Sequence, residues 1–320
     1  MVKKTLIISY ILLFAAFVAP LLYSLGTKMQ QSPPAEEKPG PAASENPARV
    51  TVLHEGEVLD MDALSYLTGV VAAEMPASFP AEALKAQAVA ARTYTAYCTA
   101  AKRHSQAQIC TYSGCCQAWM SEAQQKERWG ADYEKYSAVV RRAVEDTANE
   151  RLVYQGQPVF AAFHSSSMGA TENSSQIWNH TPYLVSVSSP ETPENLPQLI
   201  SHVTVAALDF RDTLLSVCPQ ADLSGPPESW VGESLRCESG RVDTVMIGAQ
   251  PVEATKLRQL FSLRSTNFLL DYDGTNFVFT VAGFGHGVGM SQYGANVMAS
   301  QGADYTAILA HYYPGAALVS

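Results

Sequence analysis

The stretch AEALKAQAVAARTYTAYCTAAKRH, residues 81–104, consists of good helix formers and predicts one long helix. Pro76 and Pro80 precede it and interrupt any helix before them, so this helix is expected to begin after Pro80. Five side chains recur at helical spacing and fall on one face: Leu84, Ala88, Ala91, Tyr94 and Cys98. We expect this helix to pack that face against a core.

The segments around this helix predict further elements. Residues 50–61 alternate as a short strand does, and residues 62–75 change to a helical period, with Asp62 as the N-cap. Another helix is expected over residues 126–149. The first half of the folded chain is therefore expected to be mainly helical.

The second half of the chain predicts strands. Residues 151–167 have the alternation of a β-hairpin around a Gln-Gly pair. A strand and a helix are expected over residues 242–263, and a strand, a glycine-rich loop and a final helix over residues 276–295. Residues 185–265 carry no recognisable chemistry and could form a subdomain. Because βαβ alternation is lacking, the fold class is α+β, a helical N-terminal part followed by a β-rich part.

The N-terminal residues predict a membrane anchor. Leu6 to Leu25 carry no charge and are long enough to cross about 30 Å of hydrocarbon, so residues 6–26 are expected to be a transmembrane helix. Lys3 and Lys4 place residues 1–5 in the cytoplasm and the rest of the chain outside. A cleaved signal peptide is the alternative, but its apolar region is usually shorter and ends in a small-x-small site.

The region after the anchor divides into a linker and a globular domain. Residues 27–49 are rich in Pro, Ala and Glu and predict an extended tether, and residues 50–320 form one extracytoplasmic domain. The chain has 21 Lys and Arg against 30 Asp and Glu, a net charge of -9. It therefore lacks the positive field that nucleic acid requires, and nucleic acid is not an expected partner.

Glu74 stands between VVAA and MP, at the end of a predicted helix and before a turn. Apolar neighbours there would raise its pKa by desolvation, as a general acid requires. The alternative is an exposed carboxylate at a helix terminus. The local sequence alone does not distinguish the two.

Three separated blocks carry a family resemblance. They are VVAAEMPASFPAEALKAQAVAARTYT at 70–95, FHSSSMGATENSSQIWNHTPYLVSVSSP at 163–190, and GFGHGVGMSQYGANVMASQGADYTAILAHYYPG at 283–315. In this order they resemble the stage II sporulation protein D family, which includes the amidase-enhancer proteins. The resemblance runs from about Val50 to the C-terminus and is weak in the middle.

The resemblance implies an activity and its setting. Family members similar to this chain are lytic transglycosylases that cut peptidoglycan glycan strands stripped of their peptides, during engulfment in sporulation. Their catalytic glutamate falls on Glu74, and Arg92 is implied as a second site residue, which binds substrate or supports the site electrostatically. The implied partners are a wall amidase and a membrane scaffold protein, and the implied location is the cell membrane, single-pass.

A single carboxylate suits this chemistry. Glu74 would protonate the glycosidic oxygen and then take the proton from the C6 hydroxyl of the same muramic residue, which gives anhydro-muramic ends. Hydrolysis needs a second carboxylate within about 5–9.5 Å, and Glu172 or Asp62 could supply it through the fold. Without such a partner, internal ring closure is favoured.

The second and third blocks contain candidate substrate-binding residues. Glycines in GHGVGMSQYG would let backbone amides approach a ligand, and polar side chains there would bind sugar hydroxyls. A serine nucleophile is not expected, because the G-x-S-x-G elbow is lacking. The candidates are His164, Ser165, Ser166, Tyr183, His286, Gln292 and Tyr293.

The segment HSQAQICTYSGCC, residues 104–116, predicts a Zn²⁺ site, because imidazole and thiolates are the ligands that zinc prefers. Clostridial members of the family are similar, with a zinc held by residues that match His104, Cys110 and Cys116. Cys115 is one candidate for the fourth position, and a water or a substrate group is the alternative. The spacing does not decide whether the metal would be structural or catalytic.

Disulfides are the alternative fate of the cysteines outside the cytoplasm. Cys110 could pair with Cys98, Cys115 or Cys116 and leave no metal site. Cys218 and Cys237 could close a loop of eighteen residues or remain as thiols.

Two other functions compete with the transglycosylase. One is a non-catalytic wall-binding activator of a peptidoglycan amidase, which the amidase-enhancer branch suggests. The other is metal-dependent hydrolysis, in which the cysteine cluster activates water.

Overall fold

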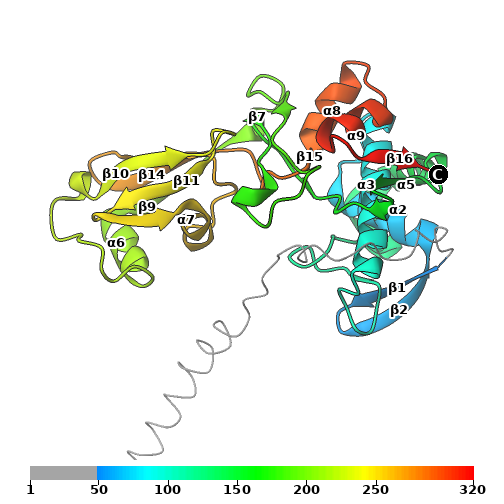
Figure 1. Ribbon diagram of the computed structural model, residues 1–320, viewed down its shortest axis with the longest axis horizontal. Coiled ribbons are helices and arrows are strands. Elements are labelled where there is room, and N and C mark those ends of the chain that lie inside the picture. Colours follow the sequence, from blue (N-terminus) through cyan, green and yellow to red (C-terminus); the bar gives the residue numbers. More distant parts are fainter. Residues whose placement is uncertain (1–48) are drawn as a thin grey trace, which may run out of the picture. The chain divides into compact units, whose positions relative to one another are not determined.

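The computed structural model describes residues 49–320 (Figure 1). The expected cytoplasmic tail at 1–5, the transmembrane helix at 6–26 and nearly all of the linker at 27–49 lie outside the described residues. Among residues 49–320, none of the helices has both the length and the apolar character needed to span a bilayer. The mixed α+β content is confirmed.

The described chain opens with a β-hairpin. β1 (Arg49–His54) pairs antiparallel with β2 (Glu57–Asp62), and the turn uses positive φ at Glu55 and Gly56. The prediction of one strand over residues 50–61 was therefore wrong, because its turn lacks a strong sequence signal. β3 (Ile109–Cys110) joins β1 in parallel.

The helix that carries the candidate acid is α2 (Ala63–Glu74). The carboxylate of Asp62 accepts a hydrogen bond from the Ser65 amide at 2.8 Å, which confirms Asp62 as the N-cap. The helix ends at Met75 because Pro76 follows. The predicted helix over 62–75 is confirmed.

The predicted long helix is α3 (Ala81–Ala100), and it lies at the centre of the helical core. Every residue from Ala86 to Thr95 is buried, so the expected apolar face is only part of a helix covered on all sides. Its neighbours are α2, α5 (Tyr133–Asp146), α8 (Gln292–Ser300) and α9 (Tyr305–Tyr312), as Figure 1 shows.

The helix predicted over residues 126–149 is divided in two. α4 (Glu122–Trp129) begins with a capping box at Ser121 and ends at Gly130, whose φ is +50°. The 3-10 turn η1 (Gly130–Asp132) then leads into α5. Gly130 at a helix end is a C-terminal signal that the single-helix prediction did not use.

The end of the chain returns to the helical core. β4 (Arg151–Tyr154) and β5 (Gln157–Pro158) form the predicted hairpin, and β16 (Ala317–Val319) pairs antiparallel with β4. α8 and α9 both contact α3. We expected a helical N-terminal part followed by a β-rich part. This order is corrected, because both ends of the described chain contribute to the helical core.

A second core, built from β-strands and two short helices, gathers residues from Val203 to Val281. It contains two three-stranded sheets, with the orders β13-β14-β9 and β10-β11-β12. Its strands are β9 (Ile200–Ala206), β10 (Val231–Arg236), β11 (Val242–Ile247), β12 (Gln250–Glu253), β13 (Phe268–Tyr272) and β14 (Asn276–Ala282). This region overlaps the segment 185–265 that we expected to form a subdomain. We call it the β unit.

The β unit begins and ends at adjacent residues. Ile200 opposes Ala282 in the pairing of β9 with β14, and the Gly283 amide donates to the Leu199 carbonyl at 2.8 Å. The two helices of the β unit are α6 (Ala207–Leu215) and α7 (Ala254–Leu260). Phe210 of α6 stacks on Phe277 with ring centroids 4.1 Å apart and is fully buried.

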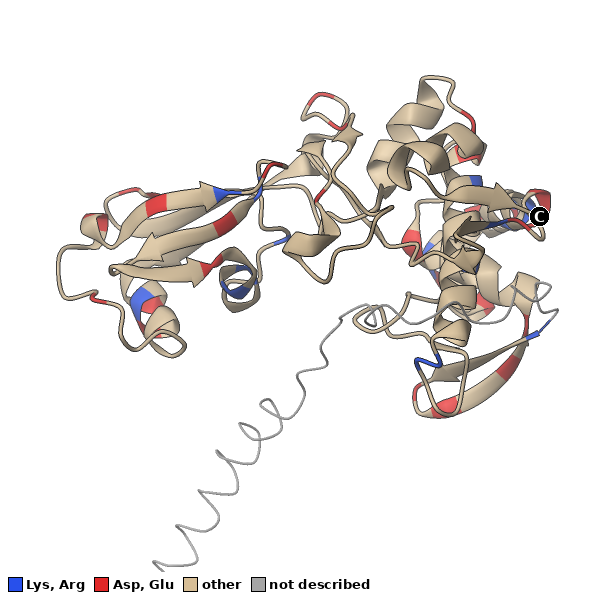
Figure 2. Ribbon diagram, viewed as in Figure 1, with Lys and Arg blue, Asp and Glu red and all other residues tan. Residues whose placement is uncertain are grey.

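The segment before the β unit has short elements only. The two-residue strands are β6 (Phe163–His164), β7 (Gly169–Ala170) and β8 (Ser188–Ser189), and β6 pairs in parallel with β15 (Met290–Ser291). The 3-10 turns of this segment are η2 (Ser174–Gln176) and η3 (Pro197–Leu199), and η4 (Pro227–Ser229) lies inside the β unit. Basic and acidic residues are interspersed over residues 49–320, without a basic stripe (Figure 2).

We predict that Phe210→Ala destabilises the β unit by about 3–5 kcal/mol, because it leaves a cavity in a fully buried aromatic cluster. The control is Leu208→Ala on the same helix, whose side chain is 63% exposed and whose loss should change stability by about 0.5 kcal/mol or less. Equilibrium urea unfolding measures both. Equal effects of the two substitutions would contradict the assigned packing.

Candidate functional site

Glu74 lies at the C-terminal end of α2, and its carboxylate meets two other parts of the chain. Oε1 accepts a hydrogen bond from the Ala118 amide at 2.7 Å. Oε2 accepts a longer one, 3.5 Å, from the Gln292 side-chain amide. The side chain is half-buried. The structure therefore brings two candidates, Glu74 and Gln292, together from residues more than 200 positions apart.

Burial raises the pKa of Glu74 above its ordinary value, and the hydrogen bonds from Ala118 and Gln292 lower it by less. The carboxyl group therefore keeps its proton to a higher pH than an exposed glutamate does. The side chain bonded to this carboxyl group is an uncharged amide, that of Gln292, which also donates to the Gln87 side-chain oxygen of α3 at 3.4 Å. The guanidinium of Arg128, on α4, donates to the Ala72 carbonyl at 3.2 Å.

The segment 117–120 is docked on α2, which fixes the Ala118 amide. The Gln117 side chain donates to the Tyr66 hydroxyl at 3.0 Å, and the Met120 amide donates to the Gly69 carbonyl at 3.1 Å. A side chain at Gly69 would overlap the Trp119 indole, so this close approach requires glycine. Ala118 was missed at the sequence level because a backbone donor has no residue-type signature.

An aromatic pair joins the segment after Glu74 to the first turn of α8. The rings of Phe79 and Tyr293 meet edge to face with centroids 5.1 Å apart, and both are half-buried. Tyr293 directly follows Gln292, and Phe79 follows Glu74 by five residues. Tyr293 was a candidate from the sequence, whereas Phe79 was missed, although it lies inside the first resemblance block.

Neither carboxylate considered as a partner accompanies Glu74. Asp62 caps the opposite end of the twelve-residue helix α2, which is about 18 Å long at 1.5 Å per residue. Glu172 is buried and accepts hydrogen bonds from the Asn173 amide at 2.8 Å and the Ser239 hydroxyl at 2.6 Å. Neither of them is hydrogen-bonded to Glu74, whose bonds go to Ala118 and Gln292.

Arg92 lies elsewhere than the sequence suggested. Its guanidinium is buried and donates to the carbonyls of Val144 at 3.0 Å and Glu150 at 3.2 Å, and these bonds cover the C-terminal end of α5. Burial lowers the pKa of Arg92 to about 10. Its hydrogen bonds thus hold α3 against the end of α5.

The His164 candidate belongs to a buried network. Its Nδ1 lies 3.2 Å from the Val288 carbonyl and its Nε2 lies 2.7 Å from the Ser167 hydroxyl. Burial holds the pKa of His164 well below its usual range, so Nδ1 donates and Nε2 accepts. The Ser167 hydroxyl also accepts from Arg241 at 3.1 Å.

The other polar candidates divide between backbone pairing and packing. Ser165 accepts the Tyr293 amide at 3.0 Å through its carbonyl, and Ser166 pairs with Phe284. The hydroxyl of Tyr183 accepts from the Phe160 amide at 2.9 Å. Of the seven binding candidates, Gln292, Tyr293 and Ser165 are joined to the surroundings of Glu74 by these contacts.

His286 lies against an aromatic side chain. Its ring centroid is 4.9 Å from that of Trp178, and its Nδ1 accepts the Val288 amide at 3.1 Å. Burial, with the positive charges of Arg258 and Arg241, lowers the pKa of His286 to about 3. His286 is therefore neutral at physiological pH.

The glycines of the loop 283–289 pack against the protein itself. All four have positive φ: Gly283, Gly285, Gly287 and Gly289. A side chain at Gly287 would overlap the buried Arg241 guanidinium, and one at Gly289 would overlap the Ala162 carbonyl. The expectation that these glycines open the backbone to a ligand is therefore corrected, because close approach inside the fold requires them.

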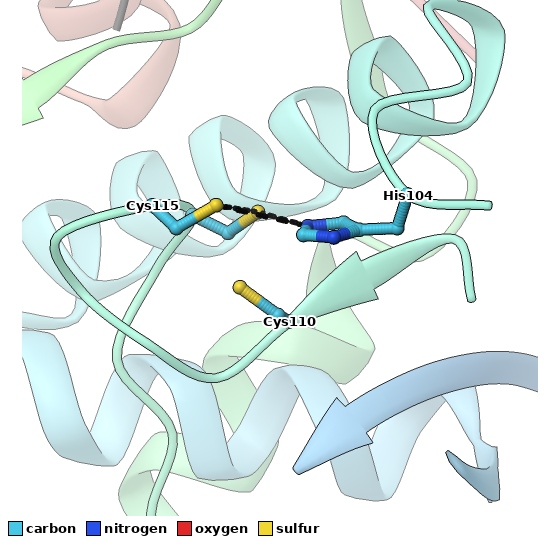
Figure 3. Close-up of side chains that lie close together, drawn as sticks. His104, Cys110 and Cys115 are labelled. Atoms are coloured by element: carbon cyan, nitrogen blue, oxygen red, sulfur yellow. Dashed lines mark hydrogen bonds between the residues drawn. The ribbon is translucent and has the colours of Figure 1, made fainter. Parts of the chain in front are cut away.

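The predicted metal ligands converge on one point. The Nε2 of His104 lies 3.2 Å from the sulfur of Cys116 and 3.8 Å from that of Cys115, and these two sulfurs are 3.9 Å apart. With Cys110, the four ligand atoms lie within 4.8 Å of one another. Figure 3 shows His104, Cys110 at the end of β3 and Cys115 pointing toward one another.

This geometry fits a tetrahedral zinc ion. Bonds of about 2.3 Å at tetrahedral angles separate two sulfurs by about 3.8 Å, close to the separation of the Cys115 and Cys116 sulfurs. The neighbouring Cys115 and Cys116 both reach the cluster because their amides donate to the Tyr112 carbonyl, at 2.9 and 2.8 Å. All six cysteines are free thiols, so none of the alternative disulfides is formed.

The fold and the site define a protein with a half-buried carboxyl group at the end of a core helix, bonded to the segment that follows a potential metal-binding loop. Residues 54–154 match the family model described as stage II sporulation protein. The chain is 36% identical over 284 residues to stage II sporulation protein D of Bacillus amyloliquefaciens, covering 86% of this chain and 80% of that protein. It therefore belongs to the stage II sporulation protein D family, as its three sequence blocks suggested.

Two further relatives extend the comparison. Stage II sporulation protein D of Bacillus subtilis (strain 168) is 36% identical over 254 residues, covering 78% of this chain and 72% of that protein. A protein named amidase enhancer from the same strain is 28% identical over 304 residues, covering 79% of this chain and 40% of that protein.

We predict that His286 makes folding pH-dependent. An unfolded histidine titrates near 6.5, and the folded pKa is lower, so the unfolded state binds more protons as the pH falls below about 6.5. Between pH 7 and pH 5 the free energy of unfolding should fall by roughly 1–2 kcal/mol through this residue, as measured by urea unfolding. His286→Gln should reduce that slope, whereas His202→Gln, at an exposed histidine, should leave it unchanged. Identical slopes in all three proteins would refute the assignment.

Proposed function

We propose that this chain is a peptidoglycan lytic transglycosylase that cleaves denuded glycan strands during sporulation, with Glu74 as the general acid and base. The observation that carries the proposal is the environment of Glu74. Burial raises its pKa, a donor contacts each of its oxygens, and neither candidate carboxylate accompanies it. Membership of the stage II sporulation protein D family supports the same setting.

In the first step Glu74 acts as an acid. Oε1 is occupied as an acceptor by the Ala118 amide, so the proton belongs on Oε2, whose bond to Gln292 is longer. This proton passes to the glycosidic oxygen as the bond to C1 of the muramic residue breaks, and the neighbouring sugar leaves with a hydroxyl group. The carboxylate that forms is stabilised by the same two donors.

In the second step Glu74 acts as a base. Its carboxylate takes the proton from the C6 hydroxyl of the same muramic residue, and the C6 oxygen bonds to C1 to close the anhydro ring. Water is not consumed, and Glu74 ends protonated as it began. A second carboxylate has no role in this sequence, which agrees with the position of Asp62 at the opposite end of α2 and with the bonding of Glu172 to Asn173 and Ser239.

The pair Phe79 and Tyr293 supports sugar binding beside Glu74. Its half-buried rings come from the segments that carry Glu74 and Gln292, and aromatic surfaces line most small-ligand sites. We assign these rings to stacking against a sugar of the glycan strand. The Tyr293 hydroxyl, which accepts from Gln198 at 3.3 Å, stands at the edge of this surface.

We also propose that His104, Cys110, Cys115 and Cys116 hold a Zn²⁺ ion with a structural role. Four protein ligands would fill a tetrahedral shell, which leaves no position for a reacting water. The ion would lock the loop that ends at Cys116, two residues before Ala118. Its contribution to the reaction is therefore to fix the amide that binds Glu74.

The location and partners follow from the same proposal. The apolar residues 6–26 would anchor the chain in the cell membrane with the described domain outside the cytoplasm. Cleavage of denuded strands requires an enzyme that removes the peptides first, so a wall amidase is the expected partner, with a membrane scaffold protein that holds the two together.

A second candidate function is activation of an amidase without cleavage. It rests on the relative named amidase enhancer, which is 28% identical to this chain. In that case glycan binding would survive the loss of the Glu74 carboxyl, and the chain would release no glycan fragments.

We predict that Glu74→Gln lowers cleavage of denuded glycan by at least about 100-fold, because the amide cannot transfer a proton. Mass spectrometry of the products should give anhydro-muramic ends with the wild-type protein. The control, Glu127→Gln at an exposed position of α4, should cleave normally. Hydrolytic ends, or full activity of Glu74→Gln, would contradict the mechanism, and intact glycan with both proteins would favour the activator.

We predict that His104→Ala lowers the zinc content of the purified protein from about one ion per chain, with loss of thermal stability, because the site loses its imidazole. Elemental analysis and thermal unfolding measure these effects. Cys218→Ala, outside the cluster, should retain zinc. Unchanged zinc content in His104→Ala would reject the site. Residual cleavage by Glu74→Gln that chelation abolishes and zinc restores would instead support metal-dependent hydrolysis.

A further inference from the structure

Glu191 is a buried carboxylate that the proposed reaction does not use. It is 1% exposed and lies just after β8, in the segment that leads to the β unit. A buried carboxylate is costly unless it is bonded, so its partners indicate what it does. These partners come from two separate parts of the chain.

The Oε1 atom of Glu191 joins two segments. It accepts the Ser167 amide at 2.9 Å and also a hydrogen bond from the Ser291 hydroxyl. Ser291 is fully buried and is the N-cap of α8, where its hydroxyl accepts the Gly294 amide at 3.2 Å. Glu191 therefore holds the cap of the helix that begins with Gln292.

The first turn of α8 has little room to move. A side chain at Gly294 would overlap the Tyr312 hydroxyl and would lie 3.0 Å from Oε2 of Glu191. The backbone of α8 at Gly294 thus packs closely against Glu191 and α9, and the N-cap residue Ser291 is bonded to Glu191. Gln292, the residue after the cap, reaches Oε2 of Glu74 at 3.5 Å and Gln87 at 3.4 Å.

We propose that Glu191 is a positioning residue, which fixes the first turn of α8 through Ser291 and so holds the Gln292 amide against Glu74. The contact series runs from Glu191 to Ser291, then to Gln292, and ends at Glu74. The functional meaning of this inference rests on the proposed role of Glu74 as the acid. The positioning itself is a property of the fold and is measured without glycan.

A second buried carboxylate provides a matched control. Glu172 is also 1% exposed, and it also accepts one backbone amide and one serine hydroxyl, from Asn173 and Ser239. These partners lie outside α8. A general effect of losing a buried negative charge would therefore appear with both carboxylates, whereas positioning of Gln292 belongs to Glu191 alone.

The experiment is an NMR titration of the Glu74 carboxyl carbon in protein labelled with carbon-13 at the glutamate carboxyl position, its signal assigned by Glu74→Gln. Gln292 lowers the pKa of Glu74 by donating a hydrogen bond, so its displacement raises that pKa. Glu191→Gln should therefore shift the titration of Glu74 to higher pH, in the same direction as Gln292→Ala. Glu172→Gln should leave it in place.

Two further variants separate positioning from a loss of folding. Ser291→Ala retains both carboxylates and removes only the hydroxyl link, so it should produce the same upward shift. The double variant Glu191→Gln with Gln292→Ala should titrate as Gln292→Ala alone, because both changes act through one contact. Additive shifts in the double variant, or an unchanged Glu74 titration in both Glu191→Gln and Ser291→Ala, overturn the inference.

The Glu74 titration tests the positioning role of Glu191, and the glycan-cleavage assay tests the proposed function, so the two proposals can fail separately. If the wild-type protein releases no anhydro-muramic products but Glu191→Gln moves the Glu74 titration, the proposed function fails and the positioning role stands. If the wild-type protein cleaves glycan and Glu191→Gln leaves the titration in place, the function stands and the positioning role fails.

Discussion

The close packing of α3 is the constraint on which the rest of the structure depends. Between Ala86 and Thr95 the helix is buried on every side, and four of its positions in this stretch are alanine. Small side chains let α2, α5, α8 and α9 approach one central helix. Because Glu74 belongs to α2 and Gln292 to α8, packing on α3 brings together two residues that the sequence separates widely.

Local sequence signals predicted the helices well and the tertiary site only in part. Asp62 before an apolar run and Pro76 after it define α2, and these signals act within a few residues. Hydrogen bonds to Glu74 from Ala118 and Gln292 depend on how distant segments pack, which helical period does not encode. Family resemblance identified Glu74, but burial in the fold explains its raised pKa.

Arg92 and the glycine loop illustrate the limit of reading function from residue type. Both stand in distinctive motifs that suggested a ligand contact. Arg92, however, bonds to the end of α5, and Gly287 leaves room for the Arg241 side chain. In both cases the fold itself needs the unusual residue. The cysteine cluster behaved differently, since ligands close in sequence also converge in space. Its short spacing left little for distant packing to change.

Ile200 pairs with Ala282, so the two ends of the β unit lie side by side and the unit is inserted between two neighbouring points of the chain. The chain leaves and re-enters at neighbouring points, so the helical core is spatially continuous from Leu199 to Gly283. Relatives could therefore lengthen, shorten or replace this module while the acid and its donors kept their geometry. A change in the β unit would then affect the helical core through the hydrogen bond between Arg241 and Ser167. The length of the β unit can thus change separately, whereas the buried hydrogen bonds of Arg241 with Ser167 and of Ser239 with Glu172 couple it to the rest of the chain.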